Sequence, residues 1–395
     1  MAPPLVIWDD RMMEYDLGGQ HPLHPLRLEL TWKLARGLGV LDGVELHSPR
    51  PADDPTLCTV HTPAYVAAVR EASIHGGPTR LIGHGLGTDD NPVFENMHDL
   101  AALIAGGSVE AALAIANGRT DRAINIAGGL HHAMPDHASG FCIYNDAALA
   151  ITAMLDAGVK KIAYVDVDVH HGDGVQAAFY NDPRVLTVSL HESPHTLWPG
   201  TGYPGEYGRG PAAGTAVNIP VPAGASDAVW LRAFHAVVPG IVTAFRPEVL
   251  VTQHGADTHR EDPLADLLVT VDGQLAVHRA LRALAEKAAG GRWLALGGGG
   301  YALVRVVPRS WTHLLATVLD RDLDPRTPVP ADWTAAAVSA RPAISPPIDM
   351  TDGAPDGPEF EPWDGSPDLP GDRWISEIRR LVYPLHGLDP HDPRD

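Results

Sequence analysis

Three side chains that can ligate a metal recur at alternate positions in one short segment. Asp166, Asp168 and His170 follow an apolar run over residues 161–167. In an extended chain, alternate side chains point to the same side, so these three groups would converge where a strand ends. Carboxylates and an imidazole that converge in this way favour a divalent metal. A solvated strand edge is a poor explanation for three such groups beside apolar residues.

Three further segments place reactive side chains just after a short apolar run. They carry His131 and His132, then Asp257, and, after four consecutive glycines, Tyr301. In open α/β sheets, function gathers at the carboxyl ends of the strands, because the loops that follow them converge. The four segments therefore predict a single site.

The candidate metal ligands are Asp168, His170 and Asp257. Two carboxylates and one imidazole leave coordination positions open for water and substrate, as catalytic rather than structural metal sites do. A metal held there would lower the pKa of its water toward ~7 and would polarise a carbonyl group.

The remaining groups can move protons and stabilise charge. His131 and His132 are candidates for the general base and acid, and Asp166 and Asp173 are available to orient their imidazoles. Tyr301, on a glycine-rich turn, could donate a hydrogen bond to a developing oxyanion. Together with a metal, these groups predict the hydrolysis of an amide bond.

The elements that must position these groups alternate between apolar strands and amphipathic or alanine-rich helices. Strands are predicted over residues 122–127, 161–168, 185–190, 248–253 and 293–296, and helices over residues 101–117, 146–157, 228–244 and 274–289. This rhythm predicts an α/β domain with right-handed crossovers and a mainly parallel sheet that helices cover on both faces.

The composition changes after about residue 320. Residues 1–320 are predicted to form a catalytic domain, and residues 321–395 a C-terminal extension rich in proline and aspartate. Such a composition is typical of a linker or of a tail laid along a surface. Residues 372–381 have helical periodicity and predict one short helix that packs on the domain.

The overall charge and composition narrow the class of protein. The formal net charge of −20 argues against binding nucleic acid through a basic surface and suits a cationic partner. The chain has only two cysteines, and we expect no signal peptide and no membrane span. These features predict a cytoplasmic protein whose oligomeric state the sequence leaves open.

The motifs, taken in order, resemble the zinc-dependent histone deacetylase family, which has an arginase-like fold, and most of all the bacterial acetoin-utilisation-type deacetylases. The resemblance covers about residues 15–315. Its motifs occupy residues 21–27, 87–92, 131–133, 139–142, 166–174, 188–191, 253–257 and 297–301. Each motif is weak alone, but the whole series in this order is specific.

The resemblance implies a role for each matching residue. It implies Zn²⁺, with Fe²⁺ as an alternative, on Asp168, His170 and Asp257. His132 with Asp173 would be the main general base and acid, His131 with Asp166 the more electrostatic pair, and Tyr301 the ligand of the acetyl oxygen. Substrate contacts are implied for Asp89, Gly140, Phe141, Trp198, Leu264 and Gly299, and an internal cavity for Arg27. Trp198 departs from the phenylalanine usual in the family and is expected to narrow or tilt the substrate tunnel.

The resemblance also implies bound K⁺ or Na⁺. An inner cation would use Asp166, Asp168, His170, Ser189 and Leu190, largely through backbone carbonyls, and an outer one Phe179, Asp182, Val185 and Thr215. Two nearby histidines are not expected to bind a metal or a cation. His171 faces away from His170 and is expected in structural hydrogen bonds, and His259 is expected near the site without ligating the metal.

Four functions remain open at this point. The first is deacetylation of acetyl-lysine in proteins, including an acyl-CoA synthetase, and the second is deacetylation of a small molecule such as an acetylated polyamine. Asp89 at the rim favours the first, whereas a closed tunnel mouth would favour the second. The third, an arginase-like binuclear hydrolase, lacks a ligand because the required acidic position is Gly172. The fourth, an acetyl-lysine reader without catalysis, is disfavoured because all the catalytic groups are present.

Overall fold

The computed structural model describes residues 3–75 and 82–395. Within them, strands form one sheet in the order β2-β1-β3-β8-β7-β4-β5-β6, and every pairing is parallel. The strands are β1 (Leu5–Ile7), β2 (Leu46–His47), β3 (Arg122–Asn125), β4 (Ile162–Asp166), β5 (Val185–Glu192), β6 (Ala216–Val221), β7 (Val249–Gln253) and β8 (Trp293–Leu296). The predicted α/β class is confirmed.

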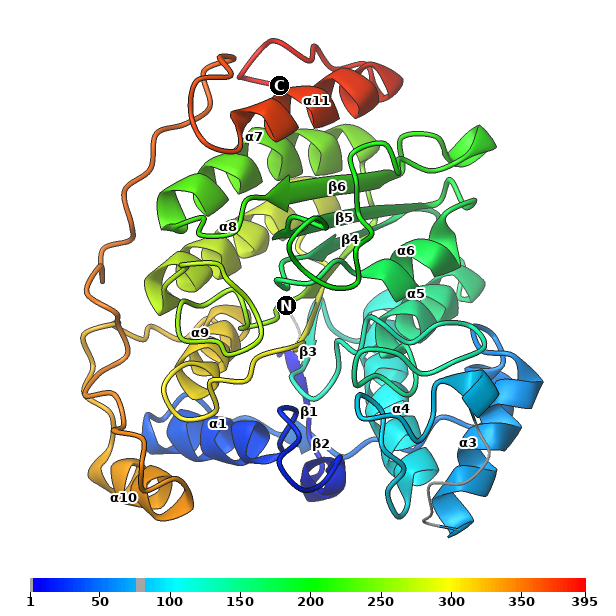
Figure 1. The fold of residues 1–395 in the computed structure, drawn as a ribbon, viewed down its shortest axis with the longest axis vertical. Helices are drawn as coiled ribbons and strands as arrows, with labels where there is room; N and C mark the ends of the chain where they lie inside the picture. Colours follow the sequence, from blue (N-terminus) through cyan, green and yellow to red (C-terminus); the bar gives the residue numbers. More distant parts are fainter. Residues whose placement is uncertain (1–2, 76–81) are drawn as a thin grey trace.

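Helices cover both faces of this sheet (Figure 1). The α-helices are α1 (Leu26–Gly37), α2 (Asp54–Leu57), α3 (Pro63–His75), α4 (Met97–Ala116), α5 (Asp146–Asp156), α6 (Asp173–Phe179), α7 (Asp227–Phe245), α8 (Val271–Ala289), α9 (Val307–Leu319), α10 (Ala331–Ala340) and α11 (Asp372–Val382). Short 3₁₀ turns are η1 (Asp10–Glu14), η2 (Ile82–His84), η3 (Gly210–Ala212) and η4 (Tyr383–His386).

The central strands are buried along their whole length. Every residue of β3, β4, β5, β7 and β8 is buried, which explains why they appear in the sequence as continuous apolar runs rather than alternating patterns. The predicted bounds of these strands lie within a few residues of the observed ones. Strand β6 was not predicted because Pro220 interrupts its pattern, and its place at the end of the strand order makes that proline acceptable.

The strand order explains how distant segments meet. Strands β3, β8, β7 and β4 are neighbours in the sheet. The loops that follow them carry, in the same order, His131 and His132, Tyr301, Asp257, and Asp168 with His170. All the candidate catalytic groups therefore leave the same edge of the sheet, as predicted for the carboxyl ends of parallel strands.

The C-terminal extension runs along one side of the molecule, from α10 beside α1 to α11 on α7 (Figure 1). The indole N–H of Trp333 donates to the carbonyl of Leu30 at 2.8 Å, and the Arg232 guanidinium of α7 pairs with the Asp372 carboxylate at 2.7 Å. Helix α11 was predicted, and α10 was not. Because Trp333, Met350 and Ile378 are buried, the extension adds to the core, and a domain boundary at residue 320 remains a prediction.

Two helices, α4 and α7, are long and apolar enough to cross a membrane by length and composition. The expectation that no segment approaches such a span was therefore wrong by this criterion. Within the fold, 78% of the apolar window of α4 and 61% of that of α7 are buried. Core helices that are apolar on most sides have this character.

Candidate active site

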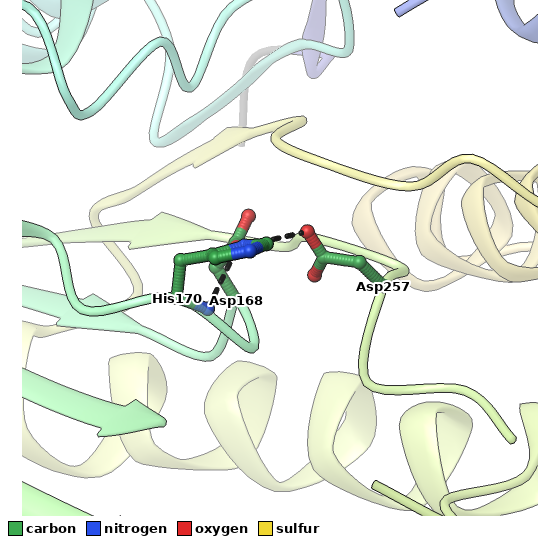
Figure 2. Close-up of side chains that lie close together, drawn as sticks. All are labelled: Asp168, His170 and Asp257. Atoms are coloured by element: carbon green, nitrogen blue, oxygen red, sulfur yellow. Dashed lines mark hydrogen bonds and ion pairs between the residues drawn. The ribbon is translucent and has the colours of Figure 1, made fainter. Parts of the chain in front are cut away.

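Asp168, His170 and Asp257 form a buried group whose ligand atoms all lie within 4.8 Å of one another. The Nδ1 atom of His170 is 3.1 Å from Oδ1 of Asp168 and 3.3 Å from Oδ2 of Asp257. Figure 2 shows the imidazole directed toward Asp257, with Asp168 beside it. The sequence predicted this triad. Because the chain leaves the extended conformation after Asp166, the carboxylate of Asp166 does not join the triad, and it accepts from the Asp168 N–H and contacts His131 instead.

Backbone and amide donors hold the two carboxylates of this triad. Oδ2 of Asp168 accepts from the Gln253 amide at 2.8 Å and from the Gly299 N–H at 2.9 Å, and Oδ1 of Asp257 accepts from the Val169 N–H at 3.0 Å. Among the described residues, Oδ2 of Asp257 has no hydrogen bond, and the nitrogen beside it at 3.3 Å is Nδ1 of His170, itself a candidate ligand. A buried carboxylate oxygen without a hydrogen bond, beside a second carboxylate and an imidazole, fits a divalent cation.

Glycines leave room for this triad. A Cβ atom at Gly299 would lie 2.0 Å from Oδ2 of Asp257, and one at Gly255 would lie 2.1 Å from Oδ2 of Asp168. A Cβ at Gly172 would lie 2.3 Å from Oδ2 of Asp166. Gly172 therefore offers no ligand where an arginase-like second metal needs an acidic side chain, and any side chain there would have to displace Asp166.

The two adjacent histidines each bind a carboxylate through Nδ1. His131 contacts Oδ2 of Asp166 at 2.7 Å, and His132 contacts Oδ1 of Asp173 at 2.7 Å. These contacts make Nδ1–H the donor and leave Nε2 of each ring free to face the site. The ring centroids are 3.9 Å apart. Both predicted pairs are present.

The surroundings shift the pKa values of the two histidines in opposite directions. Burial lowers the pKa of His131, but the negative charges of Asp166 and Asp168 outweigh it and raise this pKa to about 9. Burial, together with the positive charge of His131, lowers the pKa of His132 to about 4. His131 is therefore the ring that holds a proton more readily, and His132 the ring that is more readily a neutral base.

A cavity of about 230 Å³ opens onto the triad. Its walls are formed by Asp90, His132, Gly140, Phe141, His170, Leu197, Trp198, Leu264 and Tyr301. The indole of Trp198 meets the His132 ring edge-on at a centroid distance of 4.6 Å, and Phe141 meets Tyr301 at 5.7 Å. The predicted wall residues Gly140, Phe141, Trp198 and Leu264 thus lie together around one opening.

A strained turn brings Phe141 to the cavity. Gly140 and Phe141 both have positive φ, at 51° and 70°, and the carbonyl of Phe141 accepts from the Tyr15 hydroxyl at 2.9 Å. A Cβ at Gly140 would lie 2.5 Å from the His132 ring and 2.6 Å from the Trp198 ring. The turn therefore needs glycine at position 140, because two cavity rings approach it closely.

Tyr301 keeps its proton. Burial, followed by the charges of Asp257 and Asp168, raises the pKa of this phenol well above its ordinary value, so its hydroxyl remains a hydrogen-bond donor. Behind the glycine turn, the buried Arg27 guanidinium donates to the carbonyl of Gly298 at 2.6 Å and lies 5.1 Å from the Trp311 ring. Arg27 thus lies behind the glycine turn, and the internal cavity expected beside it remains a prediction.

Other predicted substrate contacts lie at the edge of the site. Asp89 is exposed and lines a neighbouring hollow with His21 and Val93, whereas its neighbour Asp90 lines the cavity. Gly299 is absent from the cavity lining, and its N–H is bound to Asp168. Gly299 therefore supports the metal ligands rather than the cavity wall.

The residues expected to hold monovalent cations lie in two places. Register pairing sets Asp166 of β4 beside Ser189 of β5, which brings the inner set next to the triad. In the outer set, the Asp182 N–H donates to the Phe179 carbonyl at 2.9 Å, and the Asp182 carboxylate is held by Arg184. The backbone carbonyl of Asp182 accepts from the Val185 N–H at 3.2 Å. Both cation sites remain predictions.

The sequence did not reveal two carboxylates that bind the backbone of the site loops. Asp262 accepts from the Tyr301 N–H at 2.8 Å, and Asp146 accepts from the Leu130 N–H at 2.7 Å. An acidic residue at each position was visible, but nothing in its spacing revealed its distant partner. His171 binds Thr201 and Gln176, as expected for a structural role. His259 binds Asp352 of the extension, at 2.7 Å.

The fold and the site define a hydrolase that acts on amide bonds. Residues 21–318 match the Histone deacetylase domain, and the chain belongs to the histone deacetylase family. Its members carry a divalent metal, usually zinc, and the Asp-His-Asp triad is where this chain can hold one. The protein is therefore a deacetylase.

Relatives of this chain include the Acetoin utilization protein AcuC of Bacillus subtilis (strain 168), which is 38% identical over 334 residues, 84% of this chain and 86% of that protein. The AcuC protein of Staphylococcus aureus (strain MSSA476) is 35% identical over 83% of this chain and 84% of that protein. The crystal structure of an HDAC homolog complexed with SAHA has a TM-score of 0.83 and 27% identity, covering 96% of this chain and all of that one.

Proposed function

We propose that the protein uses zinc to remove the acetyl group from acetyl-lysine side chains in proteins. One observation carries this proposal: a cavity of about 230 Å³ brings His132, Tyr301 and the triad residue His170 together between two aromatic rings. The apolar walls of Phe141 and Trp198 suit the unbranched methylene stem of lysine. The polar groups at the inner end suit its acetyl amide.

The residues divide the work of hydrolysis. Zinc on the triad would polarise the acetyl carbonyl and lower the pKa of a water. His132 takes the proton of that attacking water on Nε2, while Asp173 holds its Nδ1–H, and later gives a proton to the leaving amine. The Tyr301 hydroxyl donates to the oxygen on which negative charge develops. His131, whose pKa the carboxylates of Asp166 and Asp168 raise, would add positive charge next to the reacting groups.

The remaining predicted residues support this reaction. Leu264 and Gly140 would contact the substrate stem, and Asp89 or its neighbour Asp90 would contact the substrate backbone at the rim. Arg27 would line the route of acetate behind the site. Potassium or sodium beside Asp166 and Ser189 would stabilise the loop that bears the triad.

A second candidate substrate is an acetylated polyamine. The exposed carboxylate of Asp89 and the cavity-lining Asp90 suit a second ammonium group as well as they suit a peptide backbone. The same catalytic groups would act on either substrate, because both present an acetylated primary amine on a methylene stem.

Acetate release distinguishes these substrates. The zinc-loaded protein is incubated with an acetyl-lysine peptide and with N-acetylputrescine at matched concentrations, with the chelated protein as a control. We expect a higher kcat/KM on the peptide and no release after chelation. A preference for N-acetylputrescine would replace the protein substrate with a small molecule, and no release from either would contradict the proposal.

We further propose that the protein works in the cytoplasm, where thiols are reduced, because both of its cysteines are free. Its resemblance to acetoin utilization proteins supports an acetylated metabolic enzyme, such as an acyl-CoA synthetase, as the protein substrate.

A further inference from the structure

A short part of the C-terminal extension, residues 348–354, is bound tightly beside the catalytic loops, and we call it the docking segment. Met350 is fully buried, and its carbonyl contacts His313 Nε2 at 2.9 Å. One carboxylate oxygen of Asp272, in the first turn of α8, accepts from the Thr351 hydroxyl and from the N–H groups of Asp352 and Ala354, each at 2.9 Å. These bonds fix the backbone of the docking segment.

The side chain of Asp352 points from this segment into the catalytic domain and is only 5% exposed. Its Oδ2 accepts from Nε2 of His259 at 2.7 Å and from the N–H of Val271 at 2.9 Å. Its Oδ1 accepts from the guanidinium of Arg309 at 2.7 Å. One carboxylate from the extension thus joins a loop and the starts of α8 and α9.

His259 carries this contact into the metal-binding loop. It lies two residues after the ligand Asp257, and its side chain is fully buried. Its Nδ1 accepts from the Glu261 N–H at 3.0 Å, so the proton lies on Nε2, which donates to Asp352. Its carbonyl accepts from the Asp262 N–H at 2.8 Å. The ring therefore fixes the turn that follows Asp257.

The turn ends at Asp262, whose carboxylate binds the backbone of two residues that line the cavity. Oδ2 of Asp262 accepts from the Tyr301 N–H at 2.8 Å, and Oδ1 accepts from the Leu264 N–H at 3.0 Å. Tyr301 and Leu264 both line the cavity. A continuous series of hydrogen bonds thus runs from Asp352 through His259 and Asp262 to Tyr301.

We propose that Asp352 is a positioning residue for the active site, which sets Asp257 and Tyr301 through His259 and so makes the extension part of the catalytic unit. This inference rests on the proposed function. Asp352 lies beyond residues 21–318, which match the family domain, so this chain supplies support for its metal loop from outside that domain.

The expected loss of zinc affinity and activity can be estimated from other metal sites in which a group that orients a ligand is removed. Loss of a group that orients a ligand costs roughly 10–100-fold in metal affinity or activity. Without Asp352, the buried Nε2–H of His259 has no acceptor from the extension, and the turn that follows Asp257 loses its side-chain anchor while it keeps its backbone bonds to Val269. Zinc binding and turnover then decline together.

A matched control exists elsewhere in the extension. Asp372 is also a buried aspartate of the extension, and it pairs with Arg232 of α7 and accepts from the Leu369 N–H at 2.9 Å. None of its hydrogen bonds reaches residues 257–264. Asp372→Ala therefore removes an equivalent docking contact of the extension without touching the metal loop.

The experiment compares zinc affinity, measured by competition with a chelator, and kcat in the full-length wild type, Asp352→Ala and Asp372→Ala. We expect both variants to melt at a lower temperature. Only Asp352→Ala should bind zinc about 10–100-fold more weakly and lose kcat, whereas Asp372→Ala should stay within about twofold of the wild type in zinc affinity. Equal zinc affinity in the two variants would overturn the inference.

A second variant tests the same hydrogen bond in case Asp352→Ala does not fold. His259→Ala breaks the same hydrogen bond from its other side and leaves Asp352 paired with Arg309, so the extension stays docked. We expect at least about a tenfold loss of zinc affinity in it, and wild-type affinity would overturn the inference. Zinc binding without acetate release in the wild type would contradict the proposed function, while the comparison of zinc affinities would still decide the role of Asp352.

Discussion

Two adjacent histidines have the same kind of hydrogen-bond partner, but their pKa values are shifted in opposite directions. His131 and His132 are adjacent in sequence, and each contacts a carboxylate through Nδ1 at 2.7 Å. His131 lies deeper, next to Asp168 as well as Asp166, and its pKa rises to about 9. His132 faces the cavity, and burial beside a cationic neighbour lowers its pKa to about 4.

The difference shows that the local motif does not set the role of each histidine. A single carboxylate partner orients either ring, but the number of negative charges around the ring decides whether it carries a proton. Opposed pKa values in neighbouring groups are how one site provides both a base and a fixed positive charge. These opposed shifts support our proposal that His132 transfers protons and His131 provides electrostatic support.

The largest expected effect separates these two histidines directly. His132→Ala should lower kcat by about 10²–10⁴-fold, the usual contribution of a general acid or base, and His131→Ala should lower it less. Steady-state turnover of an acetyl-lysine substrate checks both variants, with circular dichroism as the control for folding. A greater loss in His131→Ala would reverse the assignment.

Tyr301→Phe tests the group that faces His132 across the cavity. Loss of its hydroxyl should lower kcat by about 10²–10³-fold, as for other oxyanion donors, because Tyr301 stays protonated and can donate. Zinc content, measured by atomic absorption, should not change, because the phenol is not a ligand. Near-normal turnover would remove Tyr301 from the mechanism.

Asp166→Asn should have a smaller effect than His132→Ala, about 10–100-fold in kcat. The amide still fills the space beside Gly172 but no longer supplies the negative charge that keeps His131 cationic. KM should change little, because Asp166 does not line the cavity. A loss as large as that of His132→Ala would mean that the inner pair also transfers protons.

His61 is a buried histidine outside the site, and it shows what burial does to the pKa of an imidazole. Within the part of the chain that the structure describes, it has no carboxylate partner, and burial lowers its pKa from 6.5 to about 4. Its Nδ1 contacts the Met134 carbonyl and its Nε2 accepts from the Asn145 N–H, so it is satisfied when neutral. Between these pH values the unfolded chain binds a proton that the folded protein does not, so stability is lost as the pH falls.

His61→Gln removes this titration. The stability of the wild type relative to His61→Gln should decline by about 1.4 kcal/mol per pH unit as the pH falls from about 6.5 to about 4. Urea unfolding at a series of pH values measures the difference. A difference that is constant with pH, or that grows on acidification, would contradict the account of His61.

Much of the fold was predictable because its signals are local. Strand β8 was predicted at its observed bounds, and the continuous apolar runs of β4 and β7 marked buried parallel strands. Strand β6, with its proline, and α10, in a segment rich in proline and aspartate, gave weak local signals. Packing of Trp333 against α1 fixes α10 instead.

In the site, too, some residues have local sequence signals and others do not. Asp168 and His170 are two residues apart, and Asp257 follows its own strand, so strand ends alone predicted the triad. Asp262 and Asp352 act on partners that are 39 and 93 residues away in the chain. No spacing in the sequence reveals such pairs, because they form only when the fold brings the loops and the extension together.

The central claim is that Asp168, His170 and Asp257 hold the zinc on which deacetylation depends. The most direct measurement is the zinc content of the wild type and of Asp168→Asn after dialysis, together with acetate release from an acetyl-lysine peptide. We predict one zinc per chain and acetate release in the wild type, and loss of both in the variant. Unchanged zinc content in Asp168→Asn, or full acetate release by the zinc-free wild type, would contradict the claim.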